Sequence, residues 1–148
     1  DGPKGLAQTK GAECQLVRNY VGQTLNARHT EFDKVFRVQN ASVYRSYKHQ
    51  GEETLMFHGC KSQQNEDSIV DEGFRIDKCR SGGANFGTWF AYISSYSDNG
   101  YAFVDQNGWR HLFVCLVCKY DVKRDNPTMR VVGQGGAYPQ WIVRYRHE

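Results

Sequence analysis

Two features of this 148-residue chain combine residue types and spacing that could carry chemistry. The first is the pair Cys115 and Cys118, which have the two-residue separation of many zinc ligands. However, the pair lies in the apolar segment 112–118, which is typical of a strand, and residues three apart on a strand face opposite sides of the sheet. No second Cys-x-x-Cys and no spaced histidine pair accompanies it. We therefore predict that the cysteines pack in the core and that the chain binds no metal.

The second feature is His58, which is followed directly by Gly59. A single histidine is more often a hydrogen-bonded core residue than a functional one. Here it follows the strand-like apolar run 54–57 and precedes a glycine, whose backbone can approach a ligand closely because it has no Cβ. This order of residues favours a functional site at His58.

The elements that must position such a site are predicted from apolar periodicity and turn residues. Helices are predicted over about 12–25, 43–51 and 65–71, and strands over 32–38, 54–57, 86–91, 112–120, 129–132 and 141–145. Residues 77–85 are expected to form a loop, and residues 1–11 a mobile tail. The pattern predicts a single α+β domain over residues 12–148, with helices mainly in its N-terminal half.

Composition excludes several classes of protein. With 39% hydrophobic and 24% charged residues, the chain can form a packed core rather than remain disordered. Its net charge of +3 comes from scattered basic residues, which is weak support for nucleic-acid binding. The longest apolar run, 112–118, is too short to span a membrane. Five cysteines without a regular frame predict an intracellular protein, without separating cytoplasm from nucleus.

Six segments, in order along the chain, resemble the catalytic domain of the poly(ADP-ribose) polymerase family. They are residues 36–47, the His-Gly signature in 55–59, residues 72–76, residues 86–97, residues 111–115 and residues 138–145. The resemblance implies an ADP-ribosyltransferase-like fold with two small, mostly antiparallel sheets. It also implies that NAD is the substrate and that the reaction releases nicotinamide without a metal.

The resemblance assigns roles to residues at the nicotinamide end of NAD. His58 would hydrogen-bond a ribose hydroxyl on the adenosine side, while the backbone of Gly59 and the hydroxyl of Ser97 would bind the nicotinamide amide. Tyr101 and Trp89 would sandwich the nicotinamide ring, an arrangement that suits a flat, electron-poor heterocycle. Trp89 stands where the family typically has tyrosine, so the stacking face is kept and the phenol hydroxyl is lost.

At the other end of NAD, the resemblance assigns Arg75 to the adenosine or the pyrophosphate. It also places the loop 77–83, which contains Lys78 and Arg80, over the donor site. Both assignments compete with the reading that these basic side chains are simply solvated.

Chain-forming members of the family carry a catalytic glutamate at the start of the penultimate strand. Counting back from residues 138–139 places this position at Thr128 or Met129. Neither is a carboxylate, and no glutamate occurs between Glu72 and Glu148. Asp121 and Asp125 precede the strand and are not expected to reach the site. The resemblance therefore implies either transfer of a single ADP-ribose or an inactive site, and argues against chain elongation.

Two functions remain open at this point. The first is a mono-ADP-ribosyltransferase that modifies a protein side chain or a nucleic-acid end, with the chain itself among the acceptors and an acidic acceptor supplying its own nucleophile. The second is an inactive module of the same fold that binds NAD, ADP-ribose, RNA or a protein. If RNA binds, Lys123 and Arg124 are the expected contacts. A third reading is an unrelated α+β domain.

Overall fold

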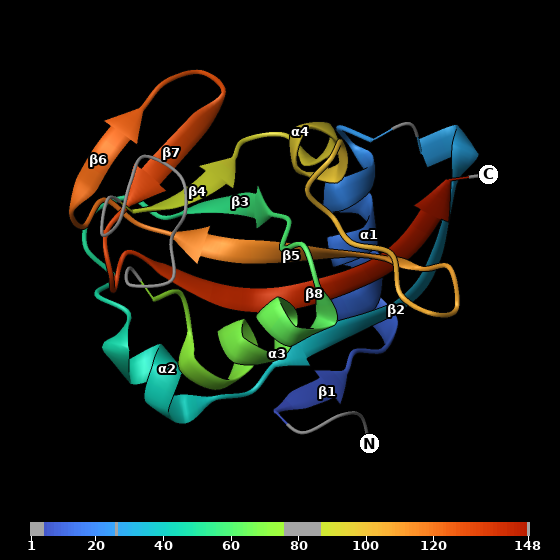
Figure 1. Cartoon of the computed structure of the whole chain (residues 1–148), viewed down its shortest axis with the longest axis horizontal. Coiled ribbons are helices and arrows are strands. Elements are labelled where there is room, and N and C mark those ends of the chain that lie inside the picture. Colours follow the sequence, from blue (N-terminus) through green and yellow to red (C-terminus); the bar gives the residue numbers. More distant parts are fainter. Residues whose placement is uncertain (1–4, 26, 76–86, 148) are drawn as a thin grey trace.

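The computed structural model describes residues 5–25, 27–75 and 87–147 (Figure 1). The loop 77–83, with Lys78 and Arg80, lies outside the described residues, as does Cys79. The predicted cover over the donor site therefore stays a prediction.

The described part of the chain contains four α-helices, three of them before residue 75 as predicted. They are α1 (Gly11–Gly22), α2 (Ala41–Ser46), α3 (Gln63–Glu72) and α4 (Ser94–Asp98), with a 3-10 turn at Ala27–His29. The strands are β1 (Leu6–Gln8), β2 (Thr30–Val38), β3 (Thr54–His58), β4 (Thr88–Ala91), β5 (Arg110–Val117), β6 (Val122–Asp125), β7 (Met129–Val132) and β8 (Ala137–His147).

All the described strands belong to one antiparallel sheet, in the order β1-β2-β8-β5-β3-β4-β7-β6. The prediction of two small sheets is therefore wrong. Its error has a local cause, because β3 and β4 meet at a single register pair, Phe57 and Ala91. The sheet thus has a long half and a short half that share this narrow junction, and Figure 1 shows β4, β7 and β6 diverging from the long strands.

Both faces of the long half are buried. Leu112 and Val114 of β5 pack in a cluster with Val17 and Val21 of α1. Their neighbours along β5 point to the opposite face, where a second cluster includes Val70 of α3. A strand buried on both faces reads as a continuous apolar run, which explains segment 112–118.

Three of the five cysteines confirm the prediction that the cysteines pack in the core. Cys60, Cys115 and Cys118 are buried in the cluster on the α3 face, and Cys14 packs partly buried against the cluster on the α1 face. The expectation that Cys115 and Cys118 face opposite sides of the sheet is wrong, because β5 ends at Val117 and strand alternation does not extend to Cys118. All four are free thiols. In the described part of the chain, no helix is long and apolar enough to cross a membrane.

The structure departs from the prediction at both edges of the sheet. Leu6–Gln8, inside the predicted mobile tail, forms β1 and pairs with β2. At the other edge, β6 pairs with β7 although all four of its residues are exposed. Because an exposed edge strand buries no apolar face, its sequence lacks the alternation by which strands are recognised.

Candidate functional site

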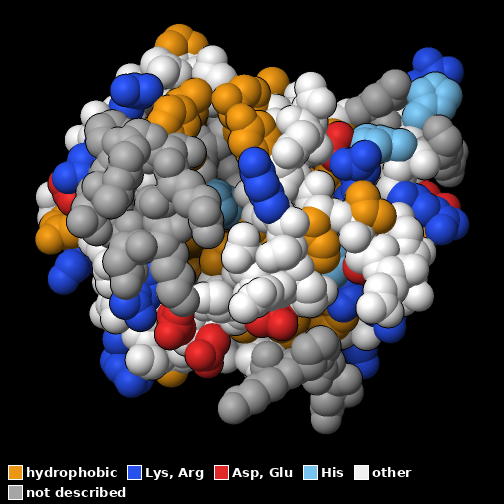
Figure 2. Space-filling model, in the orientation of Figure 1, with side chains coloured by type: hydrophobic (Ala, Val, Ile, Leu, Met, Phe, Trp, Pro, Cys, Tyr) orange, Lys and Arg blue, Asp and Glu red, His pale blue; other side chains and the backbone are white. Residues whose placement is uncertain are grey.

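A pocket of about 970 Å³ opens where the two halves of the sheet meet. Its walls come from the end of β3 and the residues after it, from α3, from β4 and from α4. Figure 2 shows this face hollowed, with hydrophobic side chains gathered at the rim. Of the eight residues predicted at the site, seven line this pocket: His58, Gly59, Arg75, Trp89, Ser97, Tyr101 and Met129. The volume lies in the range of small-molecule and cofactor sites.

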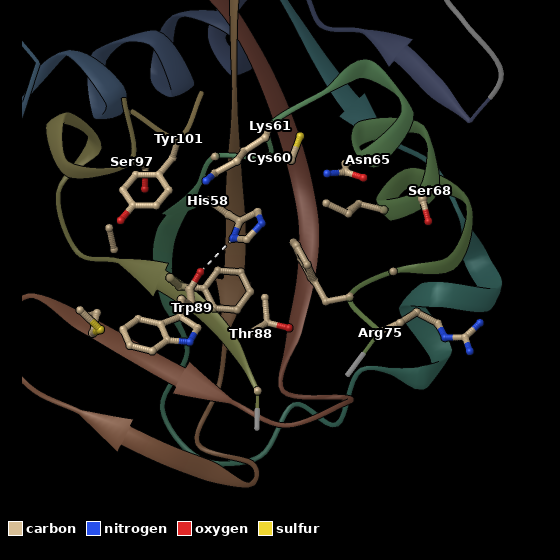
Figure 3. A pocket seen from close by; sticks show the side chains of 18 of the residues that line it. His58, Cys60, Lys61, Asn65, Ser68, Arg75, Thr88, Trp89, Ser97 and Tyr101 are labelled. Atoms are coloured by element: carbon tan, nitrogen blue, oxygen red, sulfur yellow. Dashed lines mark hydrogen bonds between the residues drawn. The ribbon is translucent and has the colours of Figure 1, made fainter. Parts of the chain in front are cut away.

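A hydrogen bond to the neighbouring strand β4 holds the ring of His58 at the centre of the pocket. Its Nδ1 lies 2.8 Å from the backbone oxygen of Trp89, and because a carbonyl only accepts, Nδ1 carries the proton (Figure 3). Burial lowers the pKa of His58, and the hydrogen bond to Trp89 only partly opposes this effect. The ring is therefore neutral, and Nε2 presents a lone pair with no partner among the described residues. It can accept a hydrogen bond from a ligand hydroxyl.

At position 59 a glycine is needed because another segment of the chain packs directly against its backbone. A Cβ at this position would lie 2.7 Å from the backbone carbon of Tyr101 and 2.8 Å from the nitrogen of Ala102. The close neighbour that the structure shows for Gly59 is the Tyr101 segment, and the predicted contact of the Gly59 backbone with the nicotinamide amide stays a prediction. The glycine lets this segment pack against the end of β3 and form one wall of the pocket.

The two aromatic residues predicted to hold a ring lie on the same side of the pocket, beside His58 (Figure 3). Trp89 has the guanidinium of Arg124 5.4 Å from its ring centroid, and its Nε1 is buried without a hydrogen-bond partner. Tyr101 stacks on Tyr96 at 5.7 Å, and the Lys61 ammonium lies 5.8 Å from its ring centroid. Cations therefore accompany both rings.

The opposite wall is formed by α3, which the sequence analysis did not assign to the site. Asn65, Ser68 and Ile69 line the pocket from one side of this helix, and Arg75 follows it with an ion pair to Glu72 at 3.7 Å. The signal was present in the sequence, because positions three and four residues apart share a helix face.

On the Tyr101 side, Ser97 is 4% exposed and its hydroxyl has no partner among the described residues.

Cys60 also lines the pocket, so its reactivity matters for any chemistry there. Burial, with a smaller contribution from the charge of Glu66, raises the pKa of Cys60 to about 12. The side chain is therefore a thiol and not a thiolate nucleophile near neutral pH.

The two residues predicted at the glutamate position, Thr128 and Met129, differ in whether they line the pocket. Met129, the first residue of β7, pairs with Ala91 and lines the pocket. Thr128 does not line it; its backbone bonds Asn126 and Tyr92 instead. The pocket wall therefore has the thioether of Met129, one of the two positions that the resemblance assigns to the catalytic glutamate.

The nearby aspartates are engaged elsewhere. Asp125 accepts hydrogen bonds from the hydroxyl of Tyr92 and from the side chains of Lys119 and Arg130. Asp121 pairs with Lys123 at 3.1 Å. Among the described lining residues the charged side chains are Lys61 and Arg75, and none is a carboxylate. The described residues contain no group of three or more His, Cys, Asp or Glu side chains placed to hold a metal.

Comparison with known proteins agrees with this geometry. The family model of the poly(ADP-ribose) polymerase catalytic domain matches residues 11–137. A probable poly(ADP-ribose) polymerase of Dictyostelium discoideum is 27% identical over 174 aligned positions, which cover 93% of this chain and 50% of the relative. The chain thus spans about half the length of this curated relative.

Proposed function

Because this chain belongs to the poly(ADP-ribose) polymerase catalytic-domain family, we propose that it is an NAD-dependent mono-ADP-ribosyltransferase. In this reaction the bond between nicotinamide and ribose breaks, and nicotinamide leaves with the bonding electron pair. An acceptor oxygen forms the new bond to the ribose carbon, and any proton on that oxygen is released. The observation that carries the proposal is the gathering of seven predicted site residues in one pocket.

The pocket residues suit the binding of NAD. Nε2 of His58 accepts a hydrogen bond from a ribose hydroxyl, since Nδ1 is already committed to Trp89. The unpartnered hydroxyl of Ser97 donates to the oxygen of the nicotinamide amide, and the rings of Trp89 and Tyr101 hold the nicotinamide between them. Such fixed contacts orient the ribose for attack and hold the leaving group.

Transfer of a single unit is supported by what stands at the start of β7. The glutamate that activates the growing chain is replaced by Met129, and no carboxylate is found among the described residues of the pocket wall. An acceptor must therefore bring its own nucleophile. We propose a protein carboxylate as acceptor, with the chain itself among the candidates and a nucleic-acid end as the alternative, in an intracellular setting.

The test is the intact mass of the purified chain after incubation with NAD, compared with His58→Ala. His29→Ala is the matched control, because His29 is exposed and lies outside the pocket. We expect one ADP-ribose increment in the wild-type chain and in His29→Ala, and none in His58→Ala. Several ADP-ribose units attached to one another at a single acceptor site would contradict single transfer.

A second candidate is a module that binds NAD or ADP-ribose without turnover. Trp89 in place of tyrosine and Met129 in place of glutamate favour it, because both departures fall in the same catalytic triad. In that case NAD raises the melting temperature of the wild-type chain while no mass increment appears. If Trp89→Tyr then gains activity, the site has lost catalysis by substitution; if NAD has no effect at all, neither function holds.

A further inference from the structure

Outside the pocket, one buried histidine has carboxylates on both ring nitrogens. His111 Nδ1 lies 2.7 Å from Oε1 of Glu66, and Nε2 lies 2.7 Å from Oδ2 of Asp105. His111 is 2% exposed and Glu66 3%. Three ionisable groups in such contact are rare inside a protein unless their charges compensate. None of the three lines the pocket.

The two carboxylates belong to segments that form opposite walls of the pocket. Glu66 lies on α3, next to the pocket-lining Asn65 and two residues before Ser68. Asp105 follows Tyr101 by four residues, on the segment that packs against Gly59. His111, on β5 between them, therefore links the α3 wall to the Tyr101 wall.

The segment that carries Asp105 is itself tied together. The side chain of Asp105 accepts hydrogen bonds from the backbone nitrogen of Asn107 at 2.8 Å and from that of Trp109 at 3.0 Å. The backbone nitrogen of His111 donates to the oxygen of Phe103 at 3.1 Å, and the Phe103 ring lies 4.5 Å from the His111 ring. Displacing Asp105 therefore moves a connected unit, at whose start Tyr101 lies.

We propose that His111, hydrogen-bonded to Glu66 and Asp105 together, is a positioning residue that holds the two walls of the NAD pocket at their binding distance. The inference rests on the proposed function, because the quantity it controls is affinity for NAD. His111 does not touch the pocket, so it acts through the Tyr101 segment and through α3.

Two carboxylates can be satisfied only if both ring nitrogens donate, which requires a protonated ring. Burial alone would lower the pKa of His111, but the hydrogen bonds and charges of Glu66 and Asp105 outweigh it and raise the pKa. The charge of Arg144 on β8 opposes this rise. Arg144 and Lys61 line a neighbouring cavity of about 480 Å³ together with His111 and Asp105. When the pH rises through the folded pKa of His111 and the ring loses its proton, one of the two hydrogen bonds is lost and the walls are released from each other.

The test compares Asp105→Asn with Glu13→Gln. Asparagine keeps the shape and an acceptor oxygen at position 105 but removes the charge. Glu13 is the matched control, since its carboxylate also joins two partners, Arg37 and Trp141, and lies outside the pocket. We expect Asp105→Asn to weaken NAD binding on the order of tenfold, the usual worth of a hydrogen bond to a charged group. Glu13→Gln should leave binding unchanged.

A pH profile separates positioning from a general loss of stability. In the wild-type chain, NAD binding should decline as the pH rises through the folded pKa of His111 and the ring deprotonates. In Asp105→Asn the midpoint of this decline should move to lower pH, because one of the two charges that favour the protonated ring is gone. An unchanged midpoint, or unchanged affinity, overturns the inference and leaves the cluster as a structural link only.

Hydrogen exchange without NAD provides the readout that does not depend on the proposed function. Asp105→Asn should speed amide exchange over residues 98–109 and over α3 together, while Glu13→Gln should not. Unchanged exchange in either wall also overturns the inference. If the wild-type chain binds no NAD, the proposed function fails first, and exchange still decides whether His111 couples the walls.

Discussion

His58 and His111 lie on neighbouring strands, β3 and β5, and both have ring nitrogens fixed by hydrogen bonds. His58 has one partner, a backbone carbonyl, whereas His111 has two, both carboxylates. Burial opposes charge on both rings. At His58 it prevails and the pKa falls, while at His111 the two carboxylates reverse the direction and the pKa rises.

The difference separates a histidine that is able to bind a ligand from one whose ring nitrogens are both occupied within the protein. A neutral ring with one committed nitrogen retains a lone pair for a ligand, and His58 presents it in the pocket. A charged ring between two carboxylates has both nitrogens occupied, so His111 can only hold elements together. Burial alone does not distinguish these roles; the identity of the partners does.

The largest expected effect on stability comes from His111→Ala. It leaves the buried Glu66 carboxylate without its cation, which typically costs about 3–5 kcal/mol. His58→Ala loses a single hydrogen bond to a carbonyl, worth about 1 kcal/mol, along with some packing. Urea unfolding of both variants measures the contrast, and equal losses of stability would remove the distinction drawn between the two histidines.

Gly59→Ala should act next in size, through the segment that joins the two regions. The added Cβ would lie 2.7 Å from the Tyr101 backbone, which cannot move as a flexible side chain does. We expect a loss of about 1–3 kcal/mol from overpacking, together with weaker NAD binding. Thermal unfolding with and without NAD tests both parts, and a fully stable variant with intact binding would show that the Tyr101 segment can shift without consequence.

The pH dependence of stability should have opposite signs for the two histidines. His58 has a lowered pKa, so its contribution is present above the unfolded value of 6.5 and is lost as the pH falls below it. His111 has a raised pKa, so its contribution is present below 6.5 and is lost as the pH rises through the folded value. We therefore expect that, between pH 5 and 9, the free energy of unfolding of His58→Gln falls less than that of the wild-type chain as the pH is lowered. That of His111→Gln should fall less than that of the wild-type chain as the pH is raised. The same pH dependence of the unfolding free energy in both variants would contradict the assigned charge states.

The smallest expected effect concerns Trp89, whose indole nitrogen has neither a carbonyl partner, as His58 has, nor a carboxylate partner, as His111 has. Its buried Nε1 has no acceptor, so Trp89→Phe removes an unpaired donor while it keeps an aromatic ring. We expect stability to change by less than about 1 kcal/mol, since the lost packing is offset by the loss of an unsatisfied group. A larger destabilisation in thermal unfolding would mean that the indole has a partner in solution.

Several elements could be predicted because their signals are local. Met129–Val132 forms β7 with the predicted bounds, and helix 65–71 corresponds to α3, which ends before Gly73 at φ +76°. β6 could not be predicted, because an exposed edge strand shows no apolar period. Nor could the single sheet be distinguished from two, since that depends on one pairing between Phe57 and Ala91.

By itself the sequence determined that a histidine and a glycine follow a buried strand, and that no glutamate is available between Glu72 and Glu148. Such features are written in composition and in short spacings. Only the tertiary structure decided which nitrogen of His58 is free, and that Met129 rather than Thr128 meets the pocket. It also brought Glu66 to His111 across 45 residues. Contacts over such separations depend on how whole elements pack, and no local period records them.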